Sequence, residues 1–290
     1  MLWLAYKITI KSSNGQALHI NVPGCGLMGS LDPINGVDVT VSTSHSVNQI
    51  GDSIDSQTVG GVLRTISGEC QTVAAAKQLL AALPPFASGR LILNDRYFCE
   101  FVVKKSPYVV RTKGSLNGRT FSAMLYCRLP YWQSVDAVQC VLGGSVPTFR
   151  LPVNYSTPHR FGVRRPSAFV NVRNSGDFRA DYRLSFRSEI GQIVNPYLLN
   201  VTTGQQMRLM TTLEPGQEYL LYWKNHHLCC TRTADGMTED VLSVLDDDST
   251  LFHLDAGDNL LKIGADSGGD NLQSTISFYS VHMGVYPDDF

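Results

Sequence analysis

Alternation of apolar and polar residues dominates the first half of the chain and predicts β-strands. The clearest case is residues 119–134, where a period of two indicates a strand with one buried face. Pro130 ends the strand because proline has no backbone donor, and Tyr131 and Trp132 follow at once. We expect Pro130, Tyr131 and Trp132 to form a domain junction. The alternating apolar positions before it are Phe121, Ala123, Leu125, Cys127 and Leu129.

The same half contains a predicted hairpin and a single predicted helix. Residues 3–22 alternate around Asn14-Gly15, a strong hairpin turn pair. Thr72 is a suitable helix N-cap, and Pro84-Pro85 ends the helix. We expect one face of this helix to pack on a sheet, through the side chains spaced at helical intervals: Val73, Ala76, Leu79, Leu80 and Leu83.

The segment 42–61 has a different pattern. It is rich in Ser, Thr, Gln and Asn, and its few apolar residues are isolated. It therefore has too little apolar surface to fold alone. We predict a long hairpin arm that projects from the domain, and the alternative is a disordered surface loop. The residues expected to make contacts from this arm are Val47, Ile50, Gly51, Asp52 and Ile54.

The second half shows short alternating segments separated by turn pairs, and no convincing helix. Examples are the turns at Asn174-Ser-Gly176 and Glu214-Pro-Gly216. Many short strands at this spacing are typical of a β-sandwich or jelly roll. We predict a mainly β protein: residues 1–133 as a split barrel or β-sandwich with one α-helix, 134–160 as a linker, and 161–290 as a second β-sandwich.

Charge is balanced overall but uneven along the chain. The formal net charge of the 290 residues is −1. Residues 104–187 contain 14 Lys or Arg and three Asp, whereas residues 235–290 contain 12 Asp or Glu and one Lys. One interpretation is two solvated faces. The other is head-to-tail complementarity, in which the basic surface of one subunit meets the acidic surface of the next.

Cysteine usage and the first residues indicate a protein made in a reducing compartment. The seven cysteines are odd in number and scattered, which favours free thiols over a disulfide framework. The first ten residues lack a basic n-region and are interrupted by Lys7, so they predict a strand and not a signal peptide. No apolar run approaches the roughly 20 residues that span a bilayer, and we expect no membrane insertion.

No sequence motif indicates catalysis, and we expect no enzyme activity and no cofactor. Neither Gly29-Ser30 nor Gly144-Ser145 makes a nucleophile elbow, and no phosphate-binding or dinucleotide loop occurs. His226 or His227 with one neighbouring cysteine could hold a metal, but adjacent strand residues face opposite ways. A solvated loop is also favoured over a calcium site for the acidic group Asp246, Asp247, Asp248, Asp255 and Asp258.

Three aromatic residues in the second half admit two interpretations. Tyr219, Tyr222 and Trp223 lie on one predicted strand. Core packing is the favoured role, and stacking on sugars is the alternative, because aromatic faces serve both purposes.

Four runs, taken in order, resemble the distal tail protein (Dit) family of phages with long flexible tails. They are Arg64-Thr-Ile-Ser-Gly-Glu69, the Leu-Pro-Tyr-Trp junction at 129–132, Val170-Asn-Val-Arg-Asn-Ser-Gly176, and the stretch 248–260, Asp-Ser-Thr-Leu-Phe-His-Leu-Asp-Ala-Gly-Asp-Asn-Leu. The resemblance covers nearly the whole chain. The aromatic junction and the last stretch are its most specific parts.

The resemblance implies a structural hub at the distal end of a phage tail, made in the bacterial cytoplasm. Its first domain would close into a hexameric ring that joins the tail tube to the tip-hub proteins, while DNA passes through the lumen without specific binding. The second domain would be a galectin-like jelly roll, and a receptor-binding protein is a possible further partner. The arm would clasp neighbouring subunits or the tube by strand addition. The alternative function is a carbohydrate-binding adhesion module.

Overall fold

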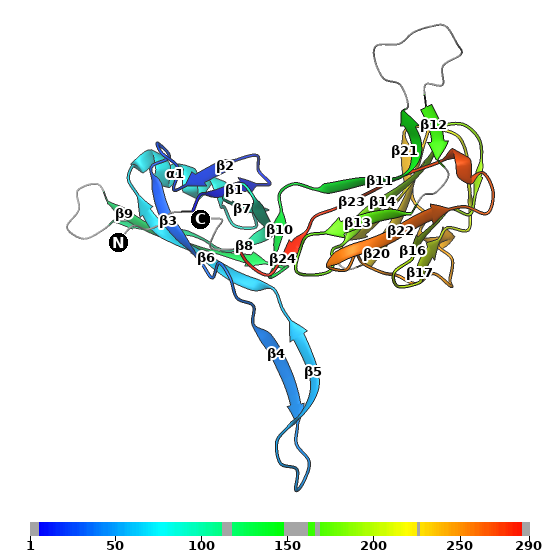
Figure 1. Ribbon diagram of the computed structural model, residues 1–290. Coiled ribbons are helices and arrows are strands. Elements are labelled where there is room, and N and C mark those ends of the chain that lie inside the picture. The colour runs from blue at the N-terminus through cyan, green and yellow to red at the C-terminus, as the bar shows by residue number, and fades with distance from the viewer. Residues whose placement is uncertain (1–5, 112–117, 148–161, 166–168, 225–226, 286–290) are drawn as a thin grey trace. The chain divides into compact units, whose positions relative to one another are not determined.

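A computed structural model describes residues 6–111, 118–147, 162–165, 169–224 and 227–285 (Figure 1). The described chain is mainly β, with one α-helix, which confirms the predicted fold class. It divides into two compact units, which we describe separately. Unit 1 comprises Met1–Asp136 and Val281–Phe290, and unit 2 comprises Ala137–Ser280.

Unit 1 is built on a curled antiparallel sheet in the order β2-β1-β7-β8-β9-β6-β3, with β10 pairing with β8 and β24. Its strands are β1 (Ile8–Ser12), β2 (Ala17–Ile20), β3 (Leu27–Asp32), β6 (Val62–Cys70), β7 (Ser88–Leu93), β8 (Tyr97–Arg111), β9 (Arg119–Cys127), β10 (Trp132–Ser134) and β24 (Val281–His282). The edge strands β2 and β3 lie close to each other. The side chain of Asn21, which follows β2, donates to the carbonyl of Gly29 in β3 at 2.8 Å and accepts from the Gly29 amide at 2.9 Å. This near-closure is compatible with a split barrel, one of the two architectures expected for residues 1–133.

The helix α1 (Val73–Ala82) packs into the hollow of this sheet, and the Thr72 hydroxyl caps it by accepting from the Ala75 amide at 3.1 Å. The predicted buried face was partly wrong. Val73 and Leu80 are about half exposed, whereas Ala75, Ala76, Leu79 and Ala82 are buried. Small residues face the sheet because the backbones lie close: a Cβ added at Gly26 would come within 3.2 Å of the Ala75 Cβ.

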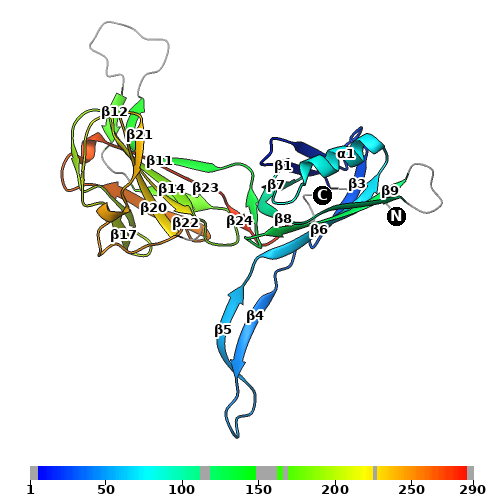
Figure 2. The same cartoon turned by 180° about the vertical axis from the view of Figure 1, so that it is seen from behind.

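An antiparallel hairpin of β4 (Val39–Ser44) and β5 (Ser53–Val59) leaves unit 1 between β3 and β6. In the described chain, these two strands pair only with each other. Both views show the hairpin extending away from the unit 1 sheet (Figure 1, Figure 2). The segment 42–61 thus contains the predicted arm, although its first strand begins earlier, at Val39.

Unit 2 is a β-sandwich. One sheet has the order β12-β11-β23-β14-β19-β20-β21 and the other β13-β22-β16-β17, with β15 and β18 pairing separately. The elements are β11 (Val138–Pro147), β12 (Gly162–Arg165), β13 (Val170–Asn174), β14 (Tyr182–Ser188), β15 (Ile193–Val194), β16 (Tyr197–Asn200), β17 (Gln205–Arg208), β18 (Thr212–Leu213), β19 (Glu218–Lys224), β20 (His227–Ala234), β21 (Met237–Asp240), η1 (Leu242–Val244), β22 (Gly257–Gly264), η2 (Gly269–Asn271) and β23 (Leu272–Phe278).

The two sheets of unit 2 enclose a core of alternating residues. Tyr182, Leu184 and Phe186 of β14 are buried, and the Tyr182 hydroxyl reaches the Met207 sulfur of the other sheet at 3.7 Å. Full burial raises the pKa of Tyr182 well above its usual value, because the charged form would lose its hydration. Most side chains of this core are apolar, and Ser188 and Ser274 are among the few buried polar ones.

The predicted boundary at 134–160 differs from the observed one. Part of the predicted linker is β11, which pairs with β23 and so is a strand of the sandwich. Residues 148–160 lie outside the described residues. The chain also returns to unit 1 after Ser280, because β24 pairs with β10. Sequence periodicity did not reveal these features, since β11 contains two adjacent glycines and β24 is two residues long.

Candidate functional site

Pro130 and Trp132 of the predicted junction are buried and form an anchor in unit 1, whereas Tyr131 is only partly buried. Trp132 is completely buried, and its indole Nε1 donates to the carbonyl of Ile34 at 2.8 Å. Trp132 also pairs with His282 of β24, whose ring meets Tyr97 edge-on at 5.3 Å between centroids. The outgoing strand β10 and the returning strand β24 are therefore side by side in the sheet of unit 1.

Arg64 completes this anchor and was not assigned a role from the sequence. It is 1% exposed, and its guanidinium lies 4.4 Å from the centre of the Trp132 ring. It donates to the carbonyls of Ile34 at 2.8 Å and Pro130 at 2.9 Å, and also to that of Pro33. The signal was present in the sequence, because Arg64 occupies an inward position of an alternating strand, where a charge needs a specific partner.

Two thiols lie beside this anchor. The sulfur atoms of Cys99 and Cys127 are 3.5 Å apart in the core of unit 1. A hydrogen bond from Cys99, together with the nearby Arg64 guanidinium, lowers the pKa of Cys127, whereas the same hydrogen bond and burial raise that of Cys99. The arginine therefore sits among backbone carbonyls and polarisable sulfur.

The arm has one apolar face, and a β-bulge produces it. Val39 lies opposite Val59, and Thr43 lies opposite Ile54, with the register shifting between Ser42 and Thr43. Asp55 is thus the extra residue of the bulge, and it places Ile54 on the same face as the valines. All four apolar side chains on this face are exposed by 44% or more: Val39, Val41, Ile54 and Val59.

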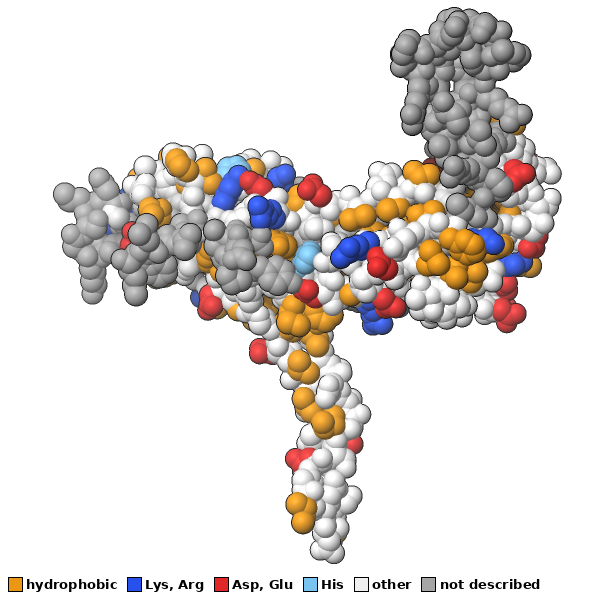
Figure 3. Space-filling model, in the orientation of Figure 1, with side chains coloured by type: hydrophobic (Ala, Val, Ile, Leu, Met, Phe, Trp, Pro, Cys, Tyr) orange, Lys and Arg blue, Asp and Glu red, His pale blue; other side chains and the backbone are white. Residues whose placement is uncertain are grey.

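The tip of the arm carries the remaining predicted contact residues. Val47 is 92% exposed and Ile50 is fully exposed. Gly51 has a positive φ of 84°, which turns the chain, and Asp52 lies 3.3 Å from the His45 ring. Hydrophobic side chains follow the arm from its base towards its tip (Figure 3). None of these residues has an apolar partner that would explain its identity within the described chain.

At the base of the arm, the chain passes tightly over the sheet. A Cβ added at Gly61 would lie 2.5 Å from the Tyr126 hydroxyl oxygen and 2.7 Å from the Cys127 carbonyl oxygen. Glycine is therefore needed where the arm joins β6. The base of the arm therefore lies close to Tyr126 of β9.

That outer face of unit 1 is also partly apolar. Leu63 of β6 and Val102 of β8 both lie opposite Tyr126 of β9, so the three side chains form one row across the sheet. Each is between 38% and 49% exposed. Val102 and Tyr126 of this row line a hollow of about 520 Å³. Arg90 and Arg128 also line it, at 3.8 and 4.0 Å from Glu100.

The three aromatic residues considered for sugar stacking do not share one face. Tyr219 is 1% exposed in the sandwich core. Trp223 stacks on His253 with 4.2 Å between ring centroids. Tyr222 lies on the outer side of β19, with the Arg183 guanidinium 5.5 Å from its ring centre. Of the three aromatic residues, only Tyr222 lies on the outer face of the sheet, because Tyr219 and Trp223 point to the opposite side of the strand.

The candidate metal ligands do not converge in the described parts of the chain, where no group of three or more His, Cys, Asp or Glu side chains could hold an ion. His226 lies outside the described residues. Cys230 is buried, which raises its pKa to about 12, with nearby Asp240 adding to the effect. Asp255 belongs to a turn that the buried Asn259 side chain organises, by donating to the Asp255 carbonyl at 2.9 Å and accepting from its amide at 3.0 Å.

Two acidic residues of the region 235–290 pair with arginines that lie outside the basic region 104–187. Arg208 and Asp266 are 2.8 Å apart, and Arg232 pairs with Glu239. Arg208 and the Asn195 side chain both bind the Asp266 carboxylate, and the hydrogen bond from Asn195 is the larger cause of its lowered pKa. Some acidic residues of the region 235–290 are therefore neutralised by the same chain.

The chain is similar in fold to two solved phage structures. The crystal structure of SPP1 Dit (gp 19.1), described as a paradigm of the hub adsorption apparatus in phages that infect Gram-positive bacteria, matches with a TM-score of 0.66 and 10% identity, over 95% of this chain and 98% of that one. A chain of the phage P2 baseplate in its activated conformation with calcium matches with a TM-score of 0.53 and 9% identity, over 98% and 100%. The resemblance to the Dit family is thus confirmed at the level of the fold.

The sequence comparisons add no further identification. No protein-family model matches the chain, and no curated protein does. Within the described residues, no helix is long and apolar enough to cross a membrane.

Proposed function

We propose that this protein is a structural hub at the distal end of a phage tail, where unit 1 assembles into a hexameric ring. The fold match over both units supports a hub, and the exposed apolar face of the arm supports assembly. The ring would join the tail tube to the tip proteins, and unit 2 would be mounted outside it. The arm face is the observation that carries the proposal, because a monomer gains nothing from keeping it in water.

Two different surfaces supply the ring contact. The arm face offers Val39, Val41 and Ile54, and the outer sheet face offers the row around Tyr126. In the proposed ring, the arm face of one copy packs on the sheet face of the next. A contact between two unlike patches is heterologous, and it closes into a ring when the rotation per subunit divides a full turn. The ion pairs that line the hollow would then border an apolar centre, as in many protein interfaces.

Removal of the arm tests this proposal. Deleting 43–59 and joining Ser42 to Gly60 with a short Gly-Ser linker should leave both units folded, because all residues of β4 and β5 are exposed. Circular dichroism and thermal melting should be unchanged. Light scattering and negative-stain imaging, performed with the tail-tube and tip partners present, should show closed rings of about six copies for the full chain and none for the deletion.

A substitution on each face provides the matched comparison. Val41→Lys should abolish rings by placing a charge in the apolar contact, whereas Thr40→Lys, on the opposite face of the same strand, should preserve them. Tyr126→Lys should reproduce the loss from the receiving side. Rings that form normally without the arm, or equally with both lysine variants, would contradict the proposed contact.

A further inference from the structure

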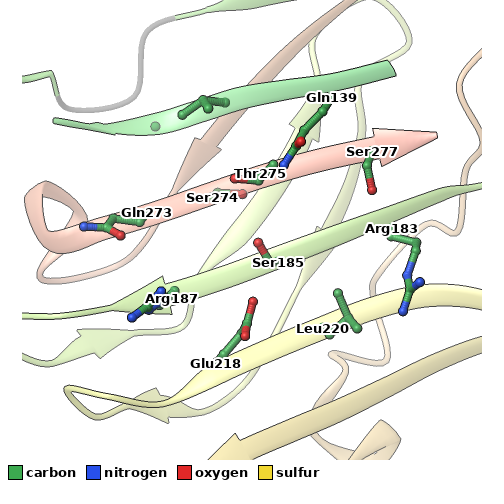
Figure 4. A pocket seen from close by; sticks show the side chains of 12 residues that line it. Gln139, Arg183, Ser185, Arg187, Glu218, Leu220, Gln273, Ser274, Thr275 and Ser277 are labelled. Carbon is green, nitrogen blue, oxygen red and sulfur yellow. The ribbon is translucent and has the colours of Figure 1, made fainter. Parts of the chain in front are cut away.

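The outer face of the larger sheet of unit 2 contains a polar groove with a volume of about 620 Å³ (Figure 4). Its residues come from the neighbouring strands β11, β23, β14 and β19. Short side chains form the floor, in which Ser185 lies opposite Thr275. Long side chains on either side make this floor a trough.

The two sides of the trough are cross-strand rows, each centred on an arginine. On one side, Arg187 lies opposite both Glu218 and Gln273. On the other side, Arg183 lies opposite both Tyr222 and Ser277. The arginines are four residues apart on one strand, or about 13 Å. A ligand on the floor would therefore meet donors and acceptors from both ends.

The charges of the groove are nearly balanced. Glu218 lies opposite Arg187, and Glu189 also approaches the Arg187 guanidinium at 3.7 Å. An anion would be opposed by these carboxylates, and a cation by the arginines. Guanidinium, carboxylate, amide and hydroxyl groups side by side suit a ligand whose groups both donate and accept hydrogen bonds. The Tyr222 ring beside Arg183 adds an aromatic surface.

We propose that this groove binds a neutral saccharide. Hydroxyl groups of a sugar ring would bond to Arg183, Glu218 and the amide groups, and the ring would lie over Ser185 and Thr275. The groove lies on β-strands whose inward side chains are buried, so the backbone that carries its residues is fixed before a ligand arrives. The site is separate from the arm and does not require ring formation.

The full-length protein should be tested on an array of neutral and anionic oligosaccharides, followed by calorimetric titration with the best neutral glycan. Arg183→Ala and Glu218→Ala should each weaken binding by about tenfold or more, because each removes charged hydrogen bonds. Thr275→Trp, which fills the floor from an outward position, should abolish binding. Arg173→Ala, an exposed arginine on the other sheet, should bind like the parent.

Several results would overturn the assignment. The first is that no neutral glycan binds at concentrations up to about 10 mM, which would mean an affinity well below ordinary weak binding. The second is that Thr275→Trp binds the glycan as well as the parent does. The third is that only anionic glycans bind and that Glu218→Ala strengthens their binding. The arm deletion separates this site from the hub. It should bind the glycan with unchanged affinity even though it forms no rings.

Discussion

The junction and the arm of unit 1 reverse the usual distribution of side chains. At the junction, Arg64 is almost completely buried and Trp132 is inaccessible to solvent. On the arm, Val47 and Ile50 are almost entirely exposed. A buried charge and an exposed apolar residue both need an explanation beyond the hydrophobic effect. The explanations differ: the junction makes stabilising contacts within the chain, whereas the arm exposes an apolar surface for the proposed assembly.

The difference predicts which measurement each region controls. The Arg64 guanidinium binds three backbone carbonyls that belong to two separate stretches of chain. Its loss must change the free energy of unfolding. The arm residues make no comparable contacts within the described chain, so their loss should change assembly and leave stability nearly unaltered. Each substitution below tests whether these two effects separate.

The largest expected effect comes from Trp132→Ala. It removes a fully buried ring and its hydrogen bond to the Ile34 carbonyl, and it should lower the free energy of unfolding by about 3–5 kcal/mol. Urea unfolding followed by circular dichroism measures this change. Tyr108→Ala removes a ring of unit 1 that is 64% exposed, and should cost about 0.5 kcal/mol or less. Similar losses in the two variants would show that Trp132 is not an anchor.

The next effect is that of Arg64→Met, which keeps an unbranched apolar stem and removes the charged guanidinium. Replacing a buried charge by an apolar group can be neutral when both partners leave, but here the carbonyls of Pro33, Ile34 and Pro130 remain. We expect a loss of about 3 kcal/mol in the free energy of unfolding. Arg128→Met, a surface position 4.0 Å from Glu100, should cost less than about 1 kcal/mol. An unaltered midpoint for Arg64→Met would rule out its bridging role.

Sequence periodicity predicted much of unit 1 because its strands have one buried face each. The alternation before Pro130 corresponds to β9, and Thr72 caps the helix as expected. The role of Arg64 required three-dimensional information, since its partners Pro33 and Ile34 lie 30 or more positions away in sequence. The return strand β24 was also missed, because two residues carry no measurable period.

The candidate surfaces were harder to predict than the fold. The arm was predicted from its polarity, but its single apolar face depends on the bulge at Asp55, which shifts the alternation that a sequence pattern follows. The groove in unit 2 combines side chains from four strands that are not consecutive in sequence. Tyr222 was grouped with Tyr219 and Trp223, although only Tyr222 borders the groove row of Arg183.

The smallest expected effect on stability tests the arm face most sharply. Exchanging Ile54 and Asp55 (Ile54→Asp with Asp55→Ile) keeps the composition and moves the apolar side chain from the paired position to the bulge. The free energy of unfolding should change by about 0.5 kcal/mol or less, because both residues are exposed. Ring formation, measured by light scattering with the tail partners, should fall strongly, since a carboxylate would replace Ile54 in the apolar contact. Asn substituted for Asp55 keeps the bulge residue polar and is the control that should assemble normally. If the exchange leaves ring formation intact, the arm contributes only its length or backbone, and the contrast with the junction would lie in exposure alone.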